Sequence, residues 1–420
     1  MPTTSEKAAR FFERIETPDS VIQAIRSKGS TPLDPERIPI GETNEETTLQ
    51  RLAFLQEKGH RFQYLNGEKK FEGIPDLHGN IENYIGMSMI PTGVIGPLHV
   101  LGTAANGDFY VPMATSEGAL VASYDRGARA TRMAGGITSI CLAEGVQRSP
   151  IFKFKHIADL SVFLTWVLQQ EEEFQKIIGQ TSRFAQLSDL KVTIEANHLI
   201  LTFEYLTGDA AGQNMVTLCT DAICQYIVRE APQKPEFWFI ESNYSGDKKA
   251  TALSFSNVRG KKVTAEVDLS RKIVEKMLRT TPEAMAHYWL SSTCGVIQSG
   301  AIGAQGHVAN GLCALFIATG QDAACTAEAA VGITRMEMNE TGGLYAALTL
   351  PNLIVGTVGG GTSLPTQREC LEMMGCYGAG HARKFAEVCA AVALAGEISI
   401  AAALSAGHFS AAHHKFGRKR

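Results

Sequence analysis

The pattern of apolar and polar positions divides this 420-residue chain into segments of different character. Residues 1–80 are charged and favour helix, and the stretch TNEETTLQRLAFLQEKG within them begins with a Thr-Asn capping signal and ends at a glycine. Residues 82–136 are rich in glycine, proline and small side chains, and a Gly- and Ala-rich composition returns after Thr251. The predicted units are an N-terminal helical segment, 1–80, and a large substrate domain, 81–141 and 240–420.

The intervening residues, 142–239, follow a different pattern. SVFLTWVLQQEEEFQKIIGQ has helical periodicity, and KVTIEANHLILTFEYL predicts two strands around an Asn-His turn. Another helix is expected from about Asn214. These signals predict a compact α/β module inserted into the large domain.

The longest apolar run, residues 388–407, is rich in alanine and is interrupted by Glu397. It therefore predicts a buried packing helix rather than a membrane span. The first 20 residues are polar and charged and lack the apolar core of a signal peptide. We expect a chain without a membrane anchor.

Composition narrows the function classes. The chain is 45% hydrophobic and 20% charged, which suits a globular protein with a substantial core. Its net charge is -4 and its basic residues are scattered, so nucleic acid and anionic membranes are not expected partners. The nine cysteines are odd in number and lack C-x-x-C spacing, which favours reduced thiols and a cytoplasmic location. We expect no metal.

Lysines and carboxylates supply the first candidates for chemistry. Asp247 directly precedes Lys248 and Lys249, which form either a solvated cluster or a lysine prepared for catalysis. Glu117 lies near the start of a predicted helix, where it is either a general acid or a glutamate favoured by the helix dipole. Asp322 stands among alanines and is expected to be buried, hence paired with a lysine or another acid. A structural pair is as compatible with this pattern as a catalytic one.

Other stretches suit a bound phosphate or cofactor. TGDAAGQNMVTLCTDAICQYI runs from glycines into an amphipathic helix, as phosphate sites do, but lacks the G-x-G-x-x-G of a Rossmann fold. Ser182 and Arg183 are suited to gripping a phosphate, or are a cap and a surface arginine. The glycines of GTVGGGTSLP permit a close pass over a ligand or form a structural loop. Three histidines in SAGHFSAAHHKFGRKR include a possible mobile acid, or are simply solvated.

Together these stretches resemble the 3-hydroxy-3-methylglutaryl-coenzyme A (HMG-CoA) reductase family from Glu82 to Arg418. ENYIGMSMIPTGVIGPL, ATSEGALVAS, TSRFAQL, GDAAGQNMV, DKKATA, HVAN, GQDAA, GTVGGGT and AGHFSAAHH follow the family's order near its spacings. The match is closest to the eukaryotic-type class, without the membrane domain of its animal members. The resemblance implies an α/β (α+β) fold with an inserted small ferredoxin-like NADPH-binding domain, and a homodimer or homotetramer with active sites at the dimer interface.

The resemblance also implies roles for four residues in the NADPH-dependent reduction of an acyl thioester to a primary alcohol. Lys248 would stabilise the oxyanion that forms when hydride reaches the carbonyl. Asp322 would keep that lysine charged and raise the pKa of Glu117, the proton donor. His413 would protonate the departing thiolate when the hemithioacetal collapses to an aldehyde. Two NADPH would be consumed per thioester.

Binding residues carry over in the same way. Ser182 and Arg183 would face the 2′-phosphate of NADPH, and Asn310 would position Lys248. The remaining cofactor contacts implied are Asp209, Gly212, Gln213, Asn214, Gly359, Gly360, Gly361 and Thr362. The coenzyme A contacts implied are Glu82, Asn83 and Arg126, with Asp125 in place of the family's asparagine.

The expected site for the substrate's free carboxylate departs from the family. Ile140 occupies the family's Arg position, Glu241 its Ser position and about Ser291 its distal Lys position, so only Lys249 remains. Losing two cationic partners, each contributing roughly 1.5–3 kcal/mol, would weaken binding on the order of a thousandfold. Glu241 would add repulsion.

We therefore predict an acyl group without a free carboxylate, carried on coenzyme A or on the pantetheine arm of a carrier protein. Three alternatives remain open. They are a genuine HMG-CoA reductase forming mevalonate, a two-electron reductase releasing an aldehyde, and a non-catalytic paralogue.

Overall fold

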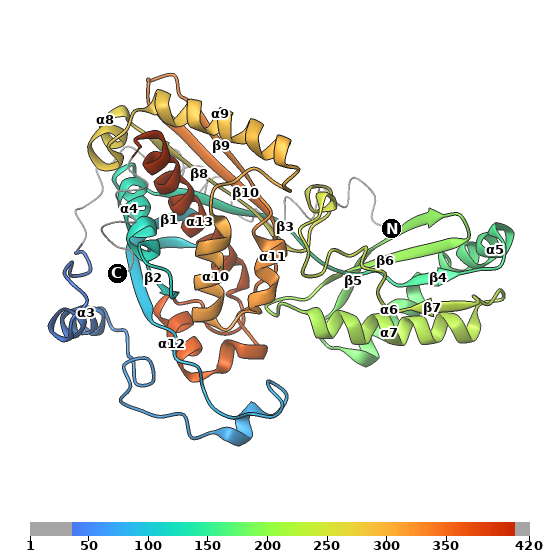
Figure 1. Ribbon diagram of the computed structural model, residues 1–420. Helices are drawn as coiled ribbons and strands as arrows, with labels where there is room; N and C mark the ends of the chain where they lie inside the picture. Colours follow the sequence, from blue (N-terminus) through green and yellow to red (C-terminus); the bar gives the residue numbers. More distant parts are fainter. Residues whose placement is uncertain (1–35, 408–420) are drawn as a thin grey trace.

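A computed structural model of the protein describes residues 36–407, without the side chains of residues 75 and 76. Figure 1 shows a large body of helices around a sheet, from which a smaller lobe extends to one side. The strands are β1 (Thr92–Gly102), β2 (Asn106–Ala114), β3 (Ile137–Arg148), β4 (Ile151–Lys153), β5 (Gln186–Glu195), β6 (His198–Leu206), β7 (Phe237–Phe239), β8 (Gly260–Leu269), β9 (Ile333–Met338) and β10 (Leu344–Leu353). The α-helices are α3 (Glu45–Glu57), α4 (Leu120–Met133), α5 (Ile157–Val167), α6 (Glu171–Thr181), α7 (Gln213–Glu230), α8 (Arg271–Ile273), α9 (Pro282–Ser299), α10 (Val308–Thr319), α11 (Thr326–Ala329), α12 (Pro365–Met373) and α13 (Ala382–Ser405). Shorter turns are η1 (Ile74–Leu77), η2 (Ala252–Phe255), η3 (Val274–Leu278), η4 (Ala323–Cys325) and η5 (Gly360–Ser363).

The strands form one connected path, β7-β4-β6-β3-β8-β10-β9, with β1 and β2 joined through β3 and with β5 beside β6. Strand pairs along it are antiparallel, and the named pair that runs parallel is β1 with β3. A Rossmann fold needs a mostly parallel sheet. The predicted mixed α/β class, and the exclusion of a Rossmann fold, are therefore confirmed.

The smaller lobe contains β4, α5, α6, β5, β6, α7 and β7, with the strand order β7-β4-β6-β5. This is the split βαβ arrangement of ferredoxin-like domains. The hairpin predicted in KVTIEANHLILTFEYL is present as β5 and β6, turning at residues 196–197. The single helical stretch predicted before it is two helices, because the chain leaves the helix at residues 168–170.

Strand β3 belongs to both parts of the molecule. Thr138 to Gly145 pair with β8 of the large body, and Val146 to Arg148 pair with β6 of the lobe. The predicted boundary at residue 142 therefore falls inside a continuous strand. The domain limits 1–80, 81–141, 142–239 and 240–420 stay a prediction.

The alanine-rich helix α13 lies at the centre of the large body, where it contacts α4, α9, α10, β3, β8 and β10. It is long and apolar enough to cross a membrane, but 83% of its apolar window is buried in the protein. Small residues let α4 approach it closely, since a Cβ added to Gly127 would lie 1.9 Å from the carbonyl oxygen of Ala395. The predicted packing helix is confirmed.

The N-terminal helix predicted from its capping signal is α3. The Asn44 side chain accepts a hydrogen bond from the Thr47 N–H, and the chain turns away at Gly59. Between this helix and β1, the described chain has the turn η1 and irregular loops.

Candidate active site

Lys248 lies in the loop between β7 and η2 and is held near a carboxylate from a distant part of the chain. Its Nζ is 3.0 Å from Oδ2 of Asp322, whose other oxygen accepts the Ala324 N–H and caps η4. The hydrogen bond that Lys248 donates to Asp322 is the largest influence on the pKa of Lys248, which is raised above its ordinary value. The lysine is therefore held in its charged form, as predicted from the resemblance.

The prediction that Asp322 is buried is wrong. Its side chain is 41% exposed and that of Lys248 is 45% exposed. The small alanine side chains that follow Asp322 do not cover it, because Ala323 and Ala324 are themselves exposed. The pair therefore faces the surface of this chain, where a substrate has access to it.

Glu117 lies in the turn between β2 and α4, three residues before the helix begins. Its Oε1 accepts a 3.2 Å hydrogen bond from Nδ2 of Asn310 in α10, and its backbone N–H donates to Thr115 Oγ1. Asn310 was expected to position Lys248. Among the hydrogen bonds of residues 36–407 its side chain donates to Glu117 instead. Asn310 is in the first turn of α10 and Asp322 follows the last turn, so within one chain Glu117 lies roughly 18 Å along this helix from the Lys248–Asp322 pair.

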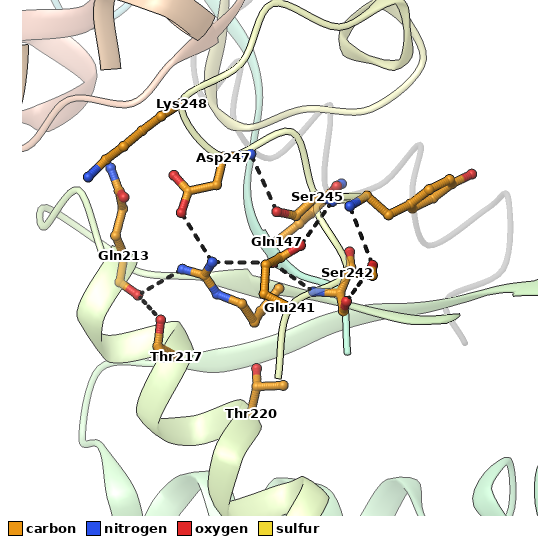
Figure 2. Close-up of polar contacts among 12 residues, drawn as sticks. Gln147, Gln213, Thr217, Thr220, Glu241, Ser242, Ser245, Asp247 and Lys248 are labelled. Carbon is orange, nitrogen blue, oxygen red and sulfur yellow. Dashed lines mark hydrogen bonds and ion pairs between the residues drawn. The ribbon is translucent and has the colours of Figure 1, made fainter. Parts of the chain in front are cut away.

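A mostly buried network of charged side chains packs against the loop that carries Lys248. Asp247 accepts from Arg259 Nη2 at 2.7 Å and from Arg148 Nη1 at 3.1 Å. Glu328 bonds to Arg259 Nε, and Glu241 lies 3.2 Å from Arg148 Nη1. Figure 2 shows Asp247 and Glu241 in this network, with Lys248 beside Asp247.

Sequence reasoning missed Arg148, Arg259 and Glu328 as members of the site. One signal was present for Glu328, since an isolated acid in the alanine-rich stretch CTAEAAVG resembles the pattern that singled out Asp322. The two arginines gave no comparable signal, because their partners are up to 112 residues away along the chain.

The structure bears on two of the three substitutions on which the altered carboxylate pocket was based; the third, Ser291, is exposed on α9. Glu241 is not a free negative charge, because it pairs with Arg148, whose side chain is only 8% exposed. Ile140 pairs with Thr264 inside the large sheet, eight residues before Arg148 on the same strand. At about 3.3 Å per residue this places it roughly 26 Å from the end of β3 that carries an arginine. A cation is therefore present beside the lysine loop.

The predicted cofactor residues of the GDAAGQN loop meet at the start of α7. Gly212 caps the helix with a φ of 81°, and a Cβ there would lie 2.4–2.7 Å from Thr207. Asp209 accepts the N–H groups of Gly380 and Ala382 and so joins this loop to the start of α13. Gln213 donates to Cys325 Sγ at 2.8 Å, while Asn214 is exposed.

The other predicted cofactor residues lie on two turns, where Arg183, Gly359 and Gly360 are exposed and Thr362 is buried. Ser182 ends α6, and its Oγ accepts the N–H groups of Phe184 and Ala185. Arg183 is exposed, and no ion pair within residues 36–407 joins it to a carboxylate. The loop Gly359, Gly360, Gly361 and Thr362 forms η5, where Gly361 packs on the backbone of Gly320.

The residues predicted for coenzyme A lie on two different parts of the chain, a loop before β1 and helix α4. Glu82 and Asn83 lie on an exposed loop before β1, where Asn83 has a φ of 52°. Arg126 is already bound to α13, since its guanidinium donates to the Ser399 hydroxyl and carbonyl.

Lys249, predicted for the substrate's carboxylate, is exposed and donates to the Asp247 carbonyl at 2.9 Å. His413 lies outside the described residues.

Fold and site together define the class of protein. It is an α/β enzyme outside the Rossmann group, with a charged lysine beside the carboxylate of Asp322, which suits stabilisation of a carbonyl oxyanion. The family model of hydroxymethylglutaryl-coenzyme A reductase matches residues 47–418. The chain belongs to the HMG-CoA reductase family.

Known proteins show the extent of the similarity. The 3-hydroxy-3-methylglutaryl-coenzyme A reductase of Pyrococcus horikoshii is 40% identical over 385 residues, which is 90% of this chain and 93% of that protein. That of Methanocaldococcus jannaschii is 42% identical over 376 residues, 88% of this chain and 92% of that protein. The class II HMG-CoA reductase of Streptococcus pneumoniae, solved bound to NADPH in open conformations, aligns with a TM-score of 0.68 at 19% identity, covering 85% of this chain and 96% of that one.

These relatives overturn the predicted substrate. Proteins that share 40–42% identity over about nine-tenths of the chain carry the name of HMG-CoA reductase. The prediction of a reductase for acyl groups without a free carboxylate is therefore wrong, and its alternative, an HMG-CoA reductase, is favoured. The physical reason for the error is the pairing of Glu241 with an arginine that sequence spacing did not place at the site.

Proposed function

We propose that this protein reduces HMG-CoA to mevalonate with NADPH. The observation that carries the proposal is the contact of Lys248 with Asp322, which holds a positive charge where a thioester oxyanion would form. Curated relatives with the same named activity over nine-tenths of the chain support the choice of substrate.

Each residue at the site has a part in this reaction. Lys248 stabilises negative charge on the carbonyl oxygen, and Asp322 keeps the lysine protonated. Glu117 gives a proton to the alkoxide in the second reduction, with its carboxyl oriented by Asn310. His413 protonates the departing coenzyme A thiolate. Lys249 and Arg148 are the cations near this loop that suit the substrate's free carboxylate.

The residues at the start of α7 fit NADPH. The left-handed Gly212 leaves no side chain over the first turn of an 18-residue helix, whose free N–H groups favour an anion. The exposed Arg183, whose guanidinium lies 6.0 Å from the centroid of the Phe184 ring, follows Ser182 directly, so a 2′-phosphate has access to both. Bound there, NADPH would supply the hydride, while Asp209 would hold the loop against α13.

The setting of the enzyme is part of the proposal. The eukaryotic-type class is part of this proposal, which the 40–42% identity to the reductases of Pyrococcus horikoshii and Methanocaldococcus jannaschii supports at the level of the family. We place it in the cytoplasm as a homodimer or homotetramer, with the exposed Lys248–Asp322 pair covered at the dimer interface.

A thioester panel with product identification tests the proposal. The purified protein is given NADPH with HMG-CoA, with acyl-CoA thioesters lacking the carboxylate, and with carrier-protein thioesters. We expect HMG-CoA to be preferred, with two NADPH oxidised per mevalonate formed. One NADPH per aldehyde would show a two-electron reductase, and no oxidation with any thioester would show a non-catalytic protein.

A further inference from the structure

One short segment of the chain, from Asp322 to Glu328, contacts both the side chain and the backbone of Lys248. Its side chain meets Asp322, which caps η4, and its backbone N–H donates to Oε1 of Glu328 at 3.2 Å. Glu328 lies six residues further on, in α11. A single turn of chain therefore supplies one carboxylate for the ammonium group and another for the backbone of the same lysine.

The backbone of Lys248 needs such support. Its φ of 56° lies in the left-handed region, which costs a residue with a Cβ roughly 1–2 kcal/mol. Conformations of this kind persist where the surroundings determine them. Gly246, two residues earlier, also has positive φ, which a glycine adopts freely, so the strain in this turn falls on Lys248.

Glu328 is well suited to fix this turn because it is itself immobile. It is 0% exposed, and its Oε2 is bound to Nε of Arg259, which is 3% exposed. Arg259 in turn donates to Asp247, the residue before Lys248, and to the carbonyl of Gln147 at 3.0 Å. Buried charges that are fully paired hold a unique geometry better than exposed ones.

We propose that Glu328 is a positioning residue for Lys248: by accepting its backbone N–H, Glu328 fixes the left-handed turn that aims the ammonium group at Asp322 and the reacting carbonyl. This inference rests on the proposed function for its effect on turnover. Its effect on the lysine itself does not depend on which thioester is reduced.

The test is Glu328→Gln in the full-length enzyme. Glutamine offers one oxygen where the carboxylate offers two, so either Arg259 or Lys248 loses its acceptor. Amine labelling of Lys248 across an alkaline pH series, measured by peptide mass spectrometry, reports the contact with Asp322. Because that contact raises the pKa of Lys248, loosening it should move the labelling midpoint to lower pH. We expect turnover to fall about 100-fold, with KM for NADPH and thioester within about threefold.

Controls separate positioning from stability. Glu387→Gln removes another buried carboxylate that accepts backbone N–H groups, at Ala104 and Ala105, and should leave the Lys248 midpoint unchanged. In a Lys248→Met background, Glu328→Gln should cost no further turnover. If Glu328→Gln does not fold, Glu328→Asp keeps the charge facing Arg259 but withdraws the acceptor from the lysine, and should shift the midpoint in the same direction.

An unchanged labelling midpoint in the folded Glu328 variants would overturn the proposal, and so would an equal loss of turnover with and without Lys248. A wild-type protein that does not reduce HMG-CoA would overturn the proposed function alone. The labelling midpoint would still decide the role of Glu328.

Discussion

Lys248 Nζ and Asp322 Oδ2 lie 3.0 Å apart, although the two residues are 74 positions apart in the sequence and both side chains are more than two-fifths exposed. An exposed ion pair contributes little to stability, because solvent screens it. Its importance here is chemical, since it fixes the charge state of a lysine at a position where an oxyanion would develop.

Asp322→Asn should therefore affect the pH dependence of turnover. The pKa of Lys248 is raised above 10.5 mainly by Asp322, so the charged pair is fully present below that pH and is lost as pH rises through the higher value of the folded protein. We expect the alkaline limb of the turnover profile to move to lower pH in the variant, and turnover at neutral pH to fall about 100-fold. Asp268→Asn, at an exposed position of β8, should change neither, and an unmoved alkaline limb in Asp322→Asn would contradict the assignment.

Arg183→Ala should weaken binding of NADPH selectively. A charge-assisted bond to the 2′-phosphate contributes roughly 1.5–3 kcal/mol, so KM for NADPH should rise about 10- to 100-fold while that for NADH stays constant. Initial rates with each nucleotide measure this. Arg335→Ala, which also removes an exposed arginine, serves as the control, and an equal rise for both nucleotides would argue against a phosphate contact.

Glu241→Ala should lower stability more than substrate affinity. The variant leaves Arg148 with Asp247 as its remaining carboxylate partner, and the free energy of unfolding should fall by about 1–3 kcal/mol in urea titrations. Glu236→Ala breaks an exposed pair with Lys153 and should cost about 0–1 kcal/mol. A large fall in KM for HMG-CoA at unchanged stability would restore the view of Glu241 as a repulsive charge.

Thiol reagents should distinguish the buried cysteines from the accessible ones. Of the nine, Cys294 is exposed and Cys313 is partly exposed, and the other seven are buried. Burial raises the pKa of Cys141 and Cys370 to about 12, so these thiols stay protonated and unreactive at neutral pH. Mass spectrometry of the native protein should find label at Cys294, some at Cys313, and label elsewhere only after unfolding. Rapid native labelling of Cys141 would be inconsistent with this packing.

Gly127→Ala tests the close approach of α4 and α13. The added methyl group would overlap the Ala395 carbonyl, and overpacking should destabilise the protein by about 1–3 kcal/mol or more. Gly179, on α6, has no atom within 4 Å of an added Cβ, so Gly179→Ala should stabilise by about 0.5–1 kcal/mol. Thermal unfolding of the two variants gives the comparison, and equal midpoints would show that the helices are free to separate.

Features of the fold could be predicted from the sequence where neighbouring residues determine them. The cap at Asn44, the β5–β6 hairpin and the packing helix α13 follow from neighbouring residues and were found. The contact of Lys248 with Asp322 followed from matching family motifs rather than from local pattern. The exposure of Asp322 was misjudged, because alanine neighbours resemble a core sequence even when they line a surface.

The pairing of Arg148 with Glu241 was out of reach for a different reason. The two residues are 93 positions apart and meet only because β3 ends beside the lysine loop. The family resemblance placed the expected arginine at Ile140, eight residues before Arg148 on the same strand. Register along a strand is decided by the pairing of distant segments, which no short motif encodes.

Strand β3 has a mechanical consequence for the enzyme. It is bonded to the large body up to Gly145 and to the lobe from Val146 onward, and it ends at Arg148, within the charge network that supports Lys248. The two parts are therefore joined here by a continuous β-strand rather than by a flexible loop. A tilt of the lobe relative to the large body would therefore have to bend or twist β3, whose end is linked through Arg148 and Asp247 to the loop that carries Lys248.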